Sequence, residues 1–221
     1  MMPSPLRIAV LASGRGSNFA TLLAARDRGE LSVEFVLVAS DKADAGAVQL
    51  AQMAGIPTLV LDPRDYAERR DYDFALFERV AASKPDLLVL AGFMRIIDGD
   101  ALKPWVGRMI NIHPSLLPKY RGLHTHRRAI KAGDAEHGAS VHYVTAELDG
   151  GPVIAQTVLR IKAGDNEKTL AERLLPLEHQ LLLAVVTLIT AGRLTLDQNS
   201  VTFDNALLHK PLRMQGGTLV R

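Results

Sequence analysis

The first half of the chain alternates short apolar runs with longer stretches in which apolar residues recur every three or four positions. Such runs are typical of buried β-strands and such stretches of helices, so their order predicts parallel strands joined by crossover helices. Because the runs are almost entirely apolar, both faces of the sheet should be covered. We expect strands over residues 7–12, 33–40, 58–61 and 86–91. We expect helices over residues 18–28, 45–54 and 70–83, ending near Gly29, Gly55 and Pro85.

Polar and apolar residues alternate over residues 109–113, which read MINIH. The apolar members can bury as a strand, which places Asn111 and His113 together on the other face, and Pro114 ends the strand. Two interpretations stay open at this point. The pair belongs to a catalytic site, or both are buried polar side chains that satisfy backbone groups.

Turn and cap signals organise the rest of the chain. A helix over residues 126–132 should precede strands over 139–144 and 153–161, which the Asp-Gly signal in ELDGGP predicts to be an antiparallel pair. The sheet should therefore be mixed.

A further helix can be capped by Asp165 or Asn166, and Pro176 should break or kink it before a second helical segment that Gly192 closes. The tail, residues 193–212, alternates like a last hairpin. The elements together predict an α/β fold with a three-layer, doubly wound, mostly parallel but mixed sheet and helices on both faces, in a single domain.

Composition narrows the function classes. The 221 residues are 48% hydrophobic and 23% charged, with a net charge of only +2, which suits one globular domain and does not favour nucleic-acid binding. There is no cysteine, so a thiolate nucleophile and a cysteine zinc site are excluded. The apolar run over residues 181–191 is too short to cross a bilayer and predicts a buried helix. We expect a cytoplasmic protein without membrane contact.

A glycine loop, SGRGSN over residues 13–18, joins the first strand to the first helix. Its backbone and the start of the helix favour a bound phosphate. A dinucleotide site is the first alternative, and Asp41 resembles the ribose-binding acid of such folds, but Phe19 replaces the third glycine. A ligand-free turn is the other alternative. We favour a monophosphate site.

Four histidines, His124, His126, His137 and His142, raise the question of a metal. No two of them have the spacing of metal ligands on an evident helix, and no flanking acid completes a set. We therefore predict no metal and interpret them as loop-packing or substrate-side residues.

Five segments taken together resemble the phosphoribosylglycinamide formyltransferase family of purine biosynthesis. These are SGRGSN, LAGFMRI, NIHPSLLPKYRGLHTH, HGASVHYVTAELDGGPVIAQ and LEH, in this order from about residue 7 to residue 194. The resemblance implies a formyltransferase-like fold. It also implies a phosphate-binding half at about residues 1–100 and a folate and catalytic half at about residues 101–221.

The resemblance implies two substrates, glycinamide ribonucleotide and the co-substrate 10-formyltetrahydrofolate, with no metal; a homodimer stays open. It also assigns site residues, which are grouped here by role. Asn111, His113 and Asp149 match the catalytic set; Gly16, Ser17, Asn18 and Glu178 match the substrate side; Arg69, Met94, Arg95, Ile96, Ile97 and Asn111 match the folate side. Arg64 and Arg70 make the placement of the Arg69 contact ambiguous.

The chemistry explains the catalytic residue types. An amine attacks a formamide-like carbonyl and creates a negative oxygen, which the amide of Asn111 and a protonated His113 can stabilise. Asp149 can orient the imidazolium or help to move the proton through water. Each assignment has a structural alternative, since Asp149 lies in a DGG turn sequence and Glu178 could simply face solvent.

Three other functions compete. Methionyl-tRNA formyltransferase and 10-formyltetrahydrofolate hydrolase use the same donor, but the first is expected to be longer at its C-terminus and the second to carry an extra N-terminal domain. A nucleotide-binding module without catalysis would explain the glycine loop and leave Asn111, His113 and Asp149 unexplained. Arg121 stands where relatives often carry another residue, and it has no assigned role.

Overall fold

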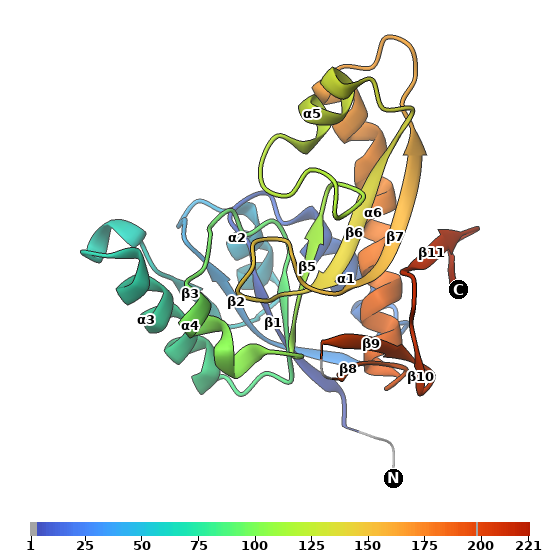
Figure 1. The fold of residues 1–221 in the computed structure, drawn as a ribbon. Helices are drawn as coiled ribbons and strands as arrows, with labels where there is room; N and C mark the ends of the chain where they lie inside the picture. Colours follow the sequence, from blue (N-terminus) through green and yellow to red (C-terminus); the bar gives the residue numbers. More distant parts are fainter. Residues whose placement is uncertain (1–3, 198) are drawn as a thin grey trace. The chain divides into compact units, whose positions relative to one another are not determined.

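The computed structural model describes residues 4–197 and 199–221, which form two compact units, Met1–Asn111 (unit 1) and Ile112–Arg221 (unit 2). Figure 1 shows the elements along the chain. Each unit has its own core.

Unit 1 is a parallel sheet with helices on both faces. Its strands, in spatial order β5-β4-β1-β2-β3, are β1 (Leu6–Leu11), β2 (Val33–Ser40), β3 (Thr58–Val60), β4 (Leu87–Leu90) and β5 (Met109–His113), whose last two residues belong to unit 2. Its α-helices are α1 (Ser17–Asp27), α2 (Gly46–Met53), α3 (Arg69–Ala82) and α4 (Gly99–Leu102). Two 3-10 turns, η1 (Pro63–Asp65) and η2 (Lys103–Trp105), complete the unit.

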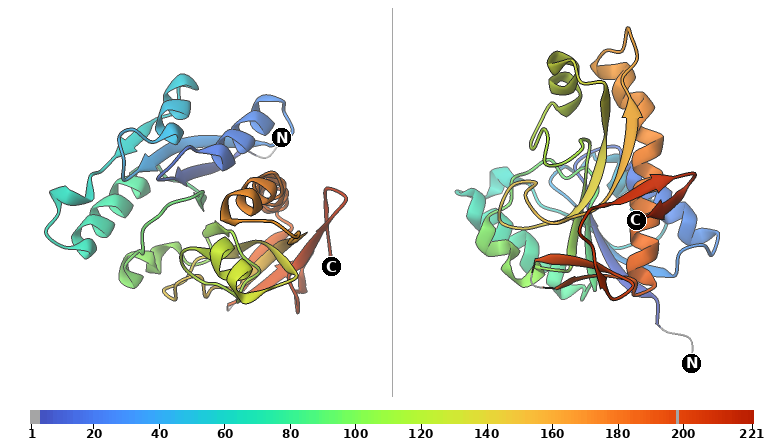
Figure 2. Two further views of the ribbon diagram at one scale, coloured as in Figure 1. Left: turned by 90° about the horizontal axis from the view of Figure 1, so that it is seen from above. Right: turned by 45° about the vertical axis from the view of Figure 1, so that its right-hand side comes forward.

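The chain order dictates which face each helix covers. From β1 the chain runs outward through α1 to β2 and through α2 to β3, and then α3 carries it back to β4 on the other side of β1. Because such crossovers are right-handed, α1 and α2 share one face and α3 covers the other. Figure 2 (left) shows this arrangement. The doubly wound, helix-covered sheet predicted from the apolar runs is confirmed for this unit.

Unit 2 is built on an antiparallel pair, β6 (Glu136–Tyr143) and β7 (Val153–Arg160). The strand β11 (Leu212–Gln215) joins β7 in parallel and β12 (Thr218–Val220) pairs with β11 in antiparallel, so the sheet is mixed, as expected. A separate small sheet contains β8 (Leu194–Asp197), β9 (Ser200–Phe203) and β10 (Ala206–Leu207). The predicted tail hairpin is therefore real, although residue 198 lies outside the described part, and β11 and β12 were not predicted.

The helices of unit 2 are α5 (Thr125–Ala132) and α6 (Glu167–Thr190), and α6 packs on β6 and β7. Asn166 caps α6, accepting hydrogen bonds from the Lys168 and Thr169 amides at 3.0 Å each. The predicted break at Pro176 is wrong, because one helix of 24 residues runs through it. Apolar residues of α6 are buried on both sides of Pro176, among them Leu174 and Leu181, and this packing stabilises the helix.

The length of α6 also changes the expectation about membranes. Within the described residues it is the one helix long and apolar enough to span a bilayer, with a mean hydropathy of 1.3 over its most apolar window. The buried core helix of a globular domain passes the same test, so this single helix is weak evidence for a membrane span.

Candidate active site

The glycine loop of unit 1 joins β1 to α1 and ends at Gly16, which caps the helix. Gly16 has φ 77°, in the left-handed region, and a Cβ at this position would lie 2.7 Å from the Cα of Ala47. The loop is also tied to α2 by a hydrogen bond from the Ala47 amide to the Gly14 carbonyl at 3.2 Å. Only glycine can occupy position 16 without moving α2.

The first turn of α1 presents backbone donors. The Ala20 amide donates to the Gly16 carbonyl at 2.8 Å, so the preceding amides of Ser17, Asn18 and Phe19 have no partner within the helix. Asn18 is buried, and its Oδ1 atom has no hydrogen-bond partner among the described residues. The three residues expected to bind phosphate therefore lie together in one turn whose helix dipole favours an anion.

The residues expected to line a folate pocket follow β4 in an irregular segment. Met94 and Ile96 are 67% and 53% exposed, while Arg95 and Ile97 are half-buried. Exposed large apolar side chains next to one another mark an interaction surface more often than a merely solvated one. The segment thus has the composition expected for contact with a flat apolar ring.

Arg69, the further folate-side residue, is the first residue of α3 and is exposed. The two neighbouring arginines are engaged in ion pairs, Arg64 with Asp62 at 2.5 Å and Arg70 with Asp100 at 3.1 Å. Within the described part of the chain Arg69 has no such ion pair. Its guanidinium is therefore the most available of the three for an anionic ligand.

The glycine loop and the segment after β4 follow adjacent strands. β1 and β4 are parallel partners, and the sheet extends through β2 and β3 on one side of this pair and through β5 on the other. Ligands of such sheets bind outside the carboxyl ends of the strands at the point where the strand order reverses. The Ser13 amide donates to the Gly92 carbonyl at 3.0 Å, which joins the two segments directly.

In unit 2, His113 ends β5 and is 6% exposed. Its Nε2 atom lies 2.9 Å from the carbonyl oxygen of Tyr120, so Nε2 carries a proton and donates it. Its Nδ1 atom lies 3.5 Å from Oδ2 of Asp149. The structure therefore brings together the histidine and the carboxylate that the sequence assigned to one site.

Asp149 lies in the connection between β6 and β7, with a left-handed backbone at φ 47°. Its Oδ2 atom accepts a hydrogen bond from the Gly122 amide at 2.8 Å. Its Oδ1 atom lies 3.6 Å from Nε2 of His142, whose Nδ1–H donates to the Tyr143 carbonyl at 2.9 Å. The carboxylate thus faces two buried imidazoles and is more than a turn residue.

His142 is the member of this group that sequence reasoning missed. Its alternation with apolar neighbours in β6 places it on one face of the strand, but nothing local in the sequence pairs it with Asp149. From the sequence it was only grouped with His124, His126 and His137, as a loop-packing or substrate-side residue.

Burial shapes the proton affinities of this group. Burial lowers the pKa of His113, and the charge of Asp149 and the bond to Tyr120 only partly oppose this effect. For Asp149, burial acts upward, yet the hydrogen bond from His142 and the charge of His113 leave its pKa below the ordinary value. The environment therefore favours an ionised Asp149. For His113, burial favours the neutral form, and the charge of Asp149 favours the protonated form.

The loop that supplies Tyr120 and Gly122 is anchored on the β6–β7 pair. The Ser140 hydroxyl donates to the Ser115 carbonyl at 2.7 Å and accepts from the Leu117 amide at 3.0 Å. Gln156, paired with Ser140 across the strands, donates to the Leu117 carbonyl at 2.9 Å. These buried bonds fix the loop that fixes His113.

Two of the other histidines, His126 and His137, contact each other. His126 and His137 share a hydrogen bond between Nδ1 and Nε2 at 3.0 Å, and burial, with the neighbouring His126, lowers the pKa of His137 to about 4. No group of three or more metal-ligating side chains was found in the part of the chain that the structure describes.

Two further expected site residues lie on β5 and on α6. Asn111 is half-buried on β5, where it pairs with Leu90 of β4. Glu178 is half-buried on α6, so it is not the fully solvated side chain that its helix position allowed.

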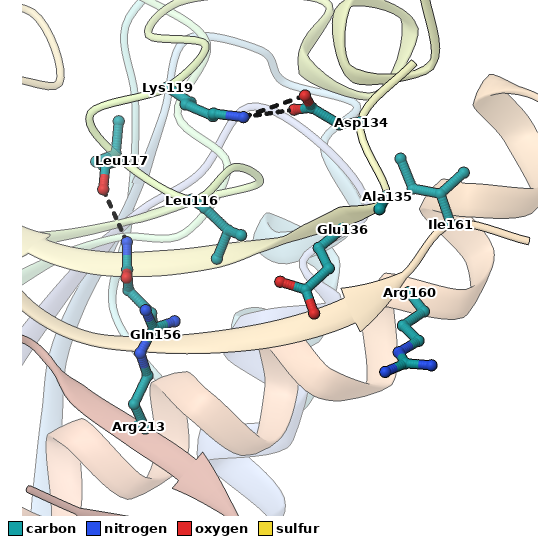
Figure 3. A pocket seen from close by; sticks show the side chains of 10 residues that line it. All are labelled: Leu116, Leu117, Lys119, Asp134, Ala135, Glu136, Gln156, Arg160, Ile161 and Arg213. Carbon is teal, nitrogen blue, oxygen red and sulfur yellow. Dashed lines mark hydrogen bonds and ion pairs between the residues drawn. The ribbon is translucent and has the colours of Figure 1, made fainter. Parts of the chain in front are cut away.

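A separate hollow of about 710 Å³ opens in unit 2 between the loop residues Leu116 and Leu117 and the strand residues Gln156, Arg160 and Arg213. Figure 3 shows Gln156 bound to Leu117 at one side and Arg160 toward the far end. Its lining includes neither His113 nor Asp149. The hollow is therefore distinct from the histidine–carboxylate group.

Comparison of the sequence with known proteins identifies its family. The model of the formyl transferase family matches residues 6–186. The chain belongs to the formyltransferase family. The resemblance predicted from its five sequence segments is confirmed.

Named relatives of this formyltransferase refine the placement. It is 43% identical over 203 residues to the phosphoribosylglycinamide formyltransferase of Escherichia coli K12, covering 92% of this chain and 96% of the relative. The enzyme of the same name from Haemophilus influenzae is 38% identical with the same coverage. The solved structure of the Coxiella burnetii enzyme superposes with a TM-score of 0.88 at 45% identity, covering 92% of this chain and 96% of that one. The predicted fold, a mostly parallel mixed sheet with helices, is thereby confirmed.

Proposed function

We propose that this formyltransferase transfers the formyl group of 10-formyltetrahydrofolate to the amine of glycinamide ribonucleotide. The similarity to phosphoribosylglycinamide formyltransferases along nearly the whole chain supports the substrate pair. The observation that supports the mechanism is the contact between Nδ1 of His113 and the buried carboxylate of Asp149 at 3.5 Å.

In the proposed reaction the substrate amine attacks the formyl carbon, and the carbonyl oxygen becomes an oxyanion. A protonated His113 carries two N–H groups. The one on Nδ1 faces Asp149, and the one on Nε2 now donates to the Tyr120 carbonyl. We propose that Nε2–H exchanges this carbonyl for the oxyanion and that the Asn111 amide donates beside it. Losing one such donor typically costs about 3–4 kcal/mol of transition-state stabilisation.

The attacking nitrogen must also lose a proton before the C–N bond to the folate breaks. Asp149 is ionised, and its side chain is only 9% exposed. It can accept that proton through a water molecule, or it can keep His113 charged while the proton moves. The folate nitrogen takes up one proton as its bond to the formyl carbon breaks, so the products are formylated glycinamide ribonucleotide and tetrahydrofolate.

The remaining site residues divide by ligand in this proposal. Gly16, Ser17 and Asn18 bind the ribose phosphate through the backbone donors of α1, and Glu178 holds the glycinamide end. The folate side is made by Met94, Arg95, Ile96, Ile97 and Asn111, with Arg69 toward an anionic part of the folate. No metal takes part. A measurement of mass in solution would show whether the protein forms a homodimer.

The decisive experiment is a spectroscopic assay of 10-formyltetrahydrofolate consumption with and without glycinamide ribonucleotide. We expect consumption only when the nucleotide is present. Equal consumption without it would identify a hydrolase instead. Glycinamide riboside, which lacks the phosphate, should bind much more weakly, and equal affinity would contradict the phosphate role of the glycine loop.

A further inference from the structure

Residues 94–98, which carry most of the proposed folate side, have no helix or strand to define their shape. Their backbone amides therefore lack the regular partners of secondary structure, and the segment exposes Met94 and Ile96 to solvent. An irregular segment with exposed apolar side chains keeps one conformation only if groups outside it hold it. Three such groups lie against it, all in unit 1.

The first holding group is Ser13, at the start of the glycine loop. Its hydroxyl oxygen accepts a hydrogen bond from the Met94 amide at 2.9 Å, and its own amide donates to the Gly92 carbonyl at 3.0 Å. Ser13 is 5% exposed, so water competes little for these bonds. One residue therefore fixes the beginning of the segment from both sides of Phe93.

The second holding group is Asp73, on α3. Its Oδ2 atom accepts a hydrogen bond from the Asp98 amide at 2.7 Å, and the residue is fully buried. A hydrogen bond to a buried carboxylate is stronger than one between neutral groups. Asp73 therefore fixes the end of the segment, just before α4 begins.

The third holding group is Tyr72, the neighbour of Asp73. The guanidinium of Arg95 lies over its ring, 4.6 Å from the centroid, in a cation–π contact. The Tyr72 hydroxyl is buried and has no hydrogen-bond partner among the described residues, so the contact rests on the ring face. The middle of the segment is thus held as well.

We infer that Ser13, Tyr72 and Asp73 are positioning residues, which hold residues 94–98 in the conformation that receives the folate co-substrate. The inference rests on the proposed function, and it gives these three residues no contact with the substrate. A segment held in its binding conformation before the ligand arrives loses less entropy on binding, so loosening it should weaken folate binding selectively.

The test compares steady-state kinetics of Asp73→Ala and Ser13→Ala with the wild-type protein. We expect the KM for 10-formyltetrahydrofolate to rise about tenfold to a hundredfold in Asp73→Ala and about threefold to tenfold in Ser13→Ala. Asp73→Asn, which keeps an acceptor oxygen, should recover part of the loss. The KM for glycinamide ribonucleotide should stay within about twofold in the two Asp73 variants, whereas a folding defect would also change this KM or kcat.

Matched variants separate the positioning role from mutation in general. Asp71→Ala removes an exposed acid two residues away on α3, and Ser83→Ala removes a hydroxyl that donates to the Val80 carbonyl at the end of the same helix. Both should keep the wild-type folate KM. Tyr72→Phe keeps the ring and should behave like the wild type, whereas Tyr72→Leu should raise the folate KM.

Amide hydrogen exchange tests the same contacts without turnover. Exchange at the Met94 amide should accelerate in Ser13→Ala and at the Asp98 amide in Asp73→Ala, while the amides of β4 keep their protection. Wild-type folate KM and wild-type exchange in these variants would overturn the inference and leave the proposed function standing. A wild-type protein that neither binds 10-formyltetrahydrofolate nor uses it would overturn both.

Discussion

In unit 1 the candidate residues offer backbone amides and exposed side chains for binding, whereas in unit 2 His113 and Asp149 are buried titratable side chains. The first turn of α1 offers amides, and residues 94–98 are held by contacts from outside the segment. In unit 2, His113 and His142 face the single carboxylate of Asp149, and all three side chains are less than 10% exposed. The residues proposed to bind ligands therefore lie mainly in unit 1, and the buried ionisable groups proposed to move charge lie in unit 2.

Variants in the two units should therefore differ in the kinetic constant that they change. Changes in the unit 1 segments should alter KM values, because they change how well a ligand is held before reaction. Changes around His113 should alter kcat, because they remove interactions that grow as charge develops. A unit 1 variant that lowers kcat alone, or a variant near His113 that changes KM alone, would contradict this comparison.

The largest effect should come from Asp149→Asn. The variant keeps the shape and an acceptor for the Gly122 amide but removes the charge that faces both histidines. We expect kcat to fall about a hundredfold or more, with KM values nearly unchanged, in the formyl-transfer assay. Glu147→Gln, an exposed carboxylate of the same connection, is the control and should keep kcat. Unchanged turnover in Asp149→Asn would remove the carboxylate from the mechanism.

Gly16→Ala should give the next largest effect, on the unit 1 side. The left-handed backbone and the approach of Ala47 to 2.7 Å together predict a loss of about 2–5 kcal/mol in the free energy of unfolding. Whatever protein folds should show a raised KM for glycinamide ribonucleotide. Gly29→Ala is the control, because Gly29 has φ 73° with no atom near its Cβ position, so it shares the strain without the collision. Denaturant titration measures both, and equal losses would argue against the close approach.

Acid should weaken unit 2 through its buried histidines. Burial and His126 lower the pKa of His137 from 6.5 to about 4, so between these values the unfolded chain binds more protons than the folded one. Protonation of His137 therefore does not affect the free energy of unfolding above about pH 6.5. As the pH falls toward 4, it lowers this free energy by about 1–3 kcal/mol. Thermal unfolding across this range measures the slope, and His137→Asn should flatten it. An identical slope in the variant would assign the effect to other groups.

The smallest effect should come from Arg121→Ala. Arg121 forms an ion pair with Glu147, but the two side chains are 39% and 64% exposed, where such pairs contribute little. We expect a change in stability within about 0.5 kcal/mol and normal kinetics, measured as for the larger effects. A large fall in kcat would instead mean that this pair helps to hold the loop beside His113.

The fold was predicted best where burial alone decides the pattern. The strand over residues 33–40 matches β2 at both ends, because a strand covered on both faces has a mostly apolar sequence. The strand over residues 109–113 matches β5 at both ends, because its polar and apolar residues alternate as far as Pro114. Partners distant in sequence were harder. β11 was missed because it depends on pairing with β7, Leu212 with Ala155, which leaves no trace in its own short sequence.

The candidate site divides in the same way. Local chemistry pointed to the glycine loop and to His113, since glycine spacing and strand alternation are visible in a few residues. Asp149 entered only through the family resemblance, because its role depends on a 3.5 Å approach across more than thirty residues of chain. Tyr72 and Asp73 read as parts of an ordinary helix, because a pattern shows that a face is buried but not what lies against it.

The left-handed backbone of Asp149 determines how its asparagine variant will behave in a stored sample. Asparagine tolerates this conformation as well as aspartate does, so the uncharged variant should fold normally. The next residue is Gly150, and asparagine followed by glycine is the dipeptide most prone to deamidation, because the unhindered peptide nitrogen attacks the side-chain amide. Hydrolysis of the resulting ring gives mainly isoaspartate and, in smaller part, aspartate. A stored sample of the inactive variant will therefore slowly regain some wild-type protein, and activity that grows with the age of the sample would come from this restored aspartate.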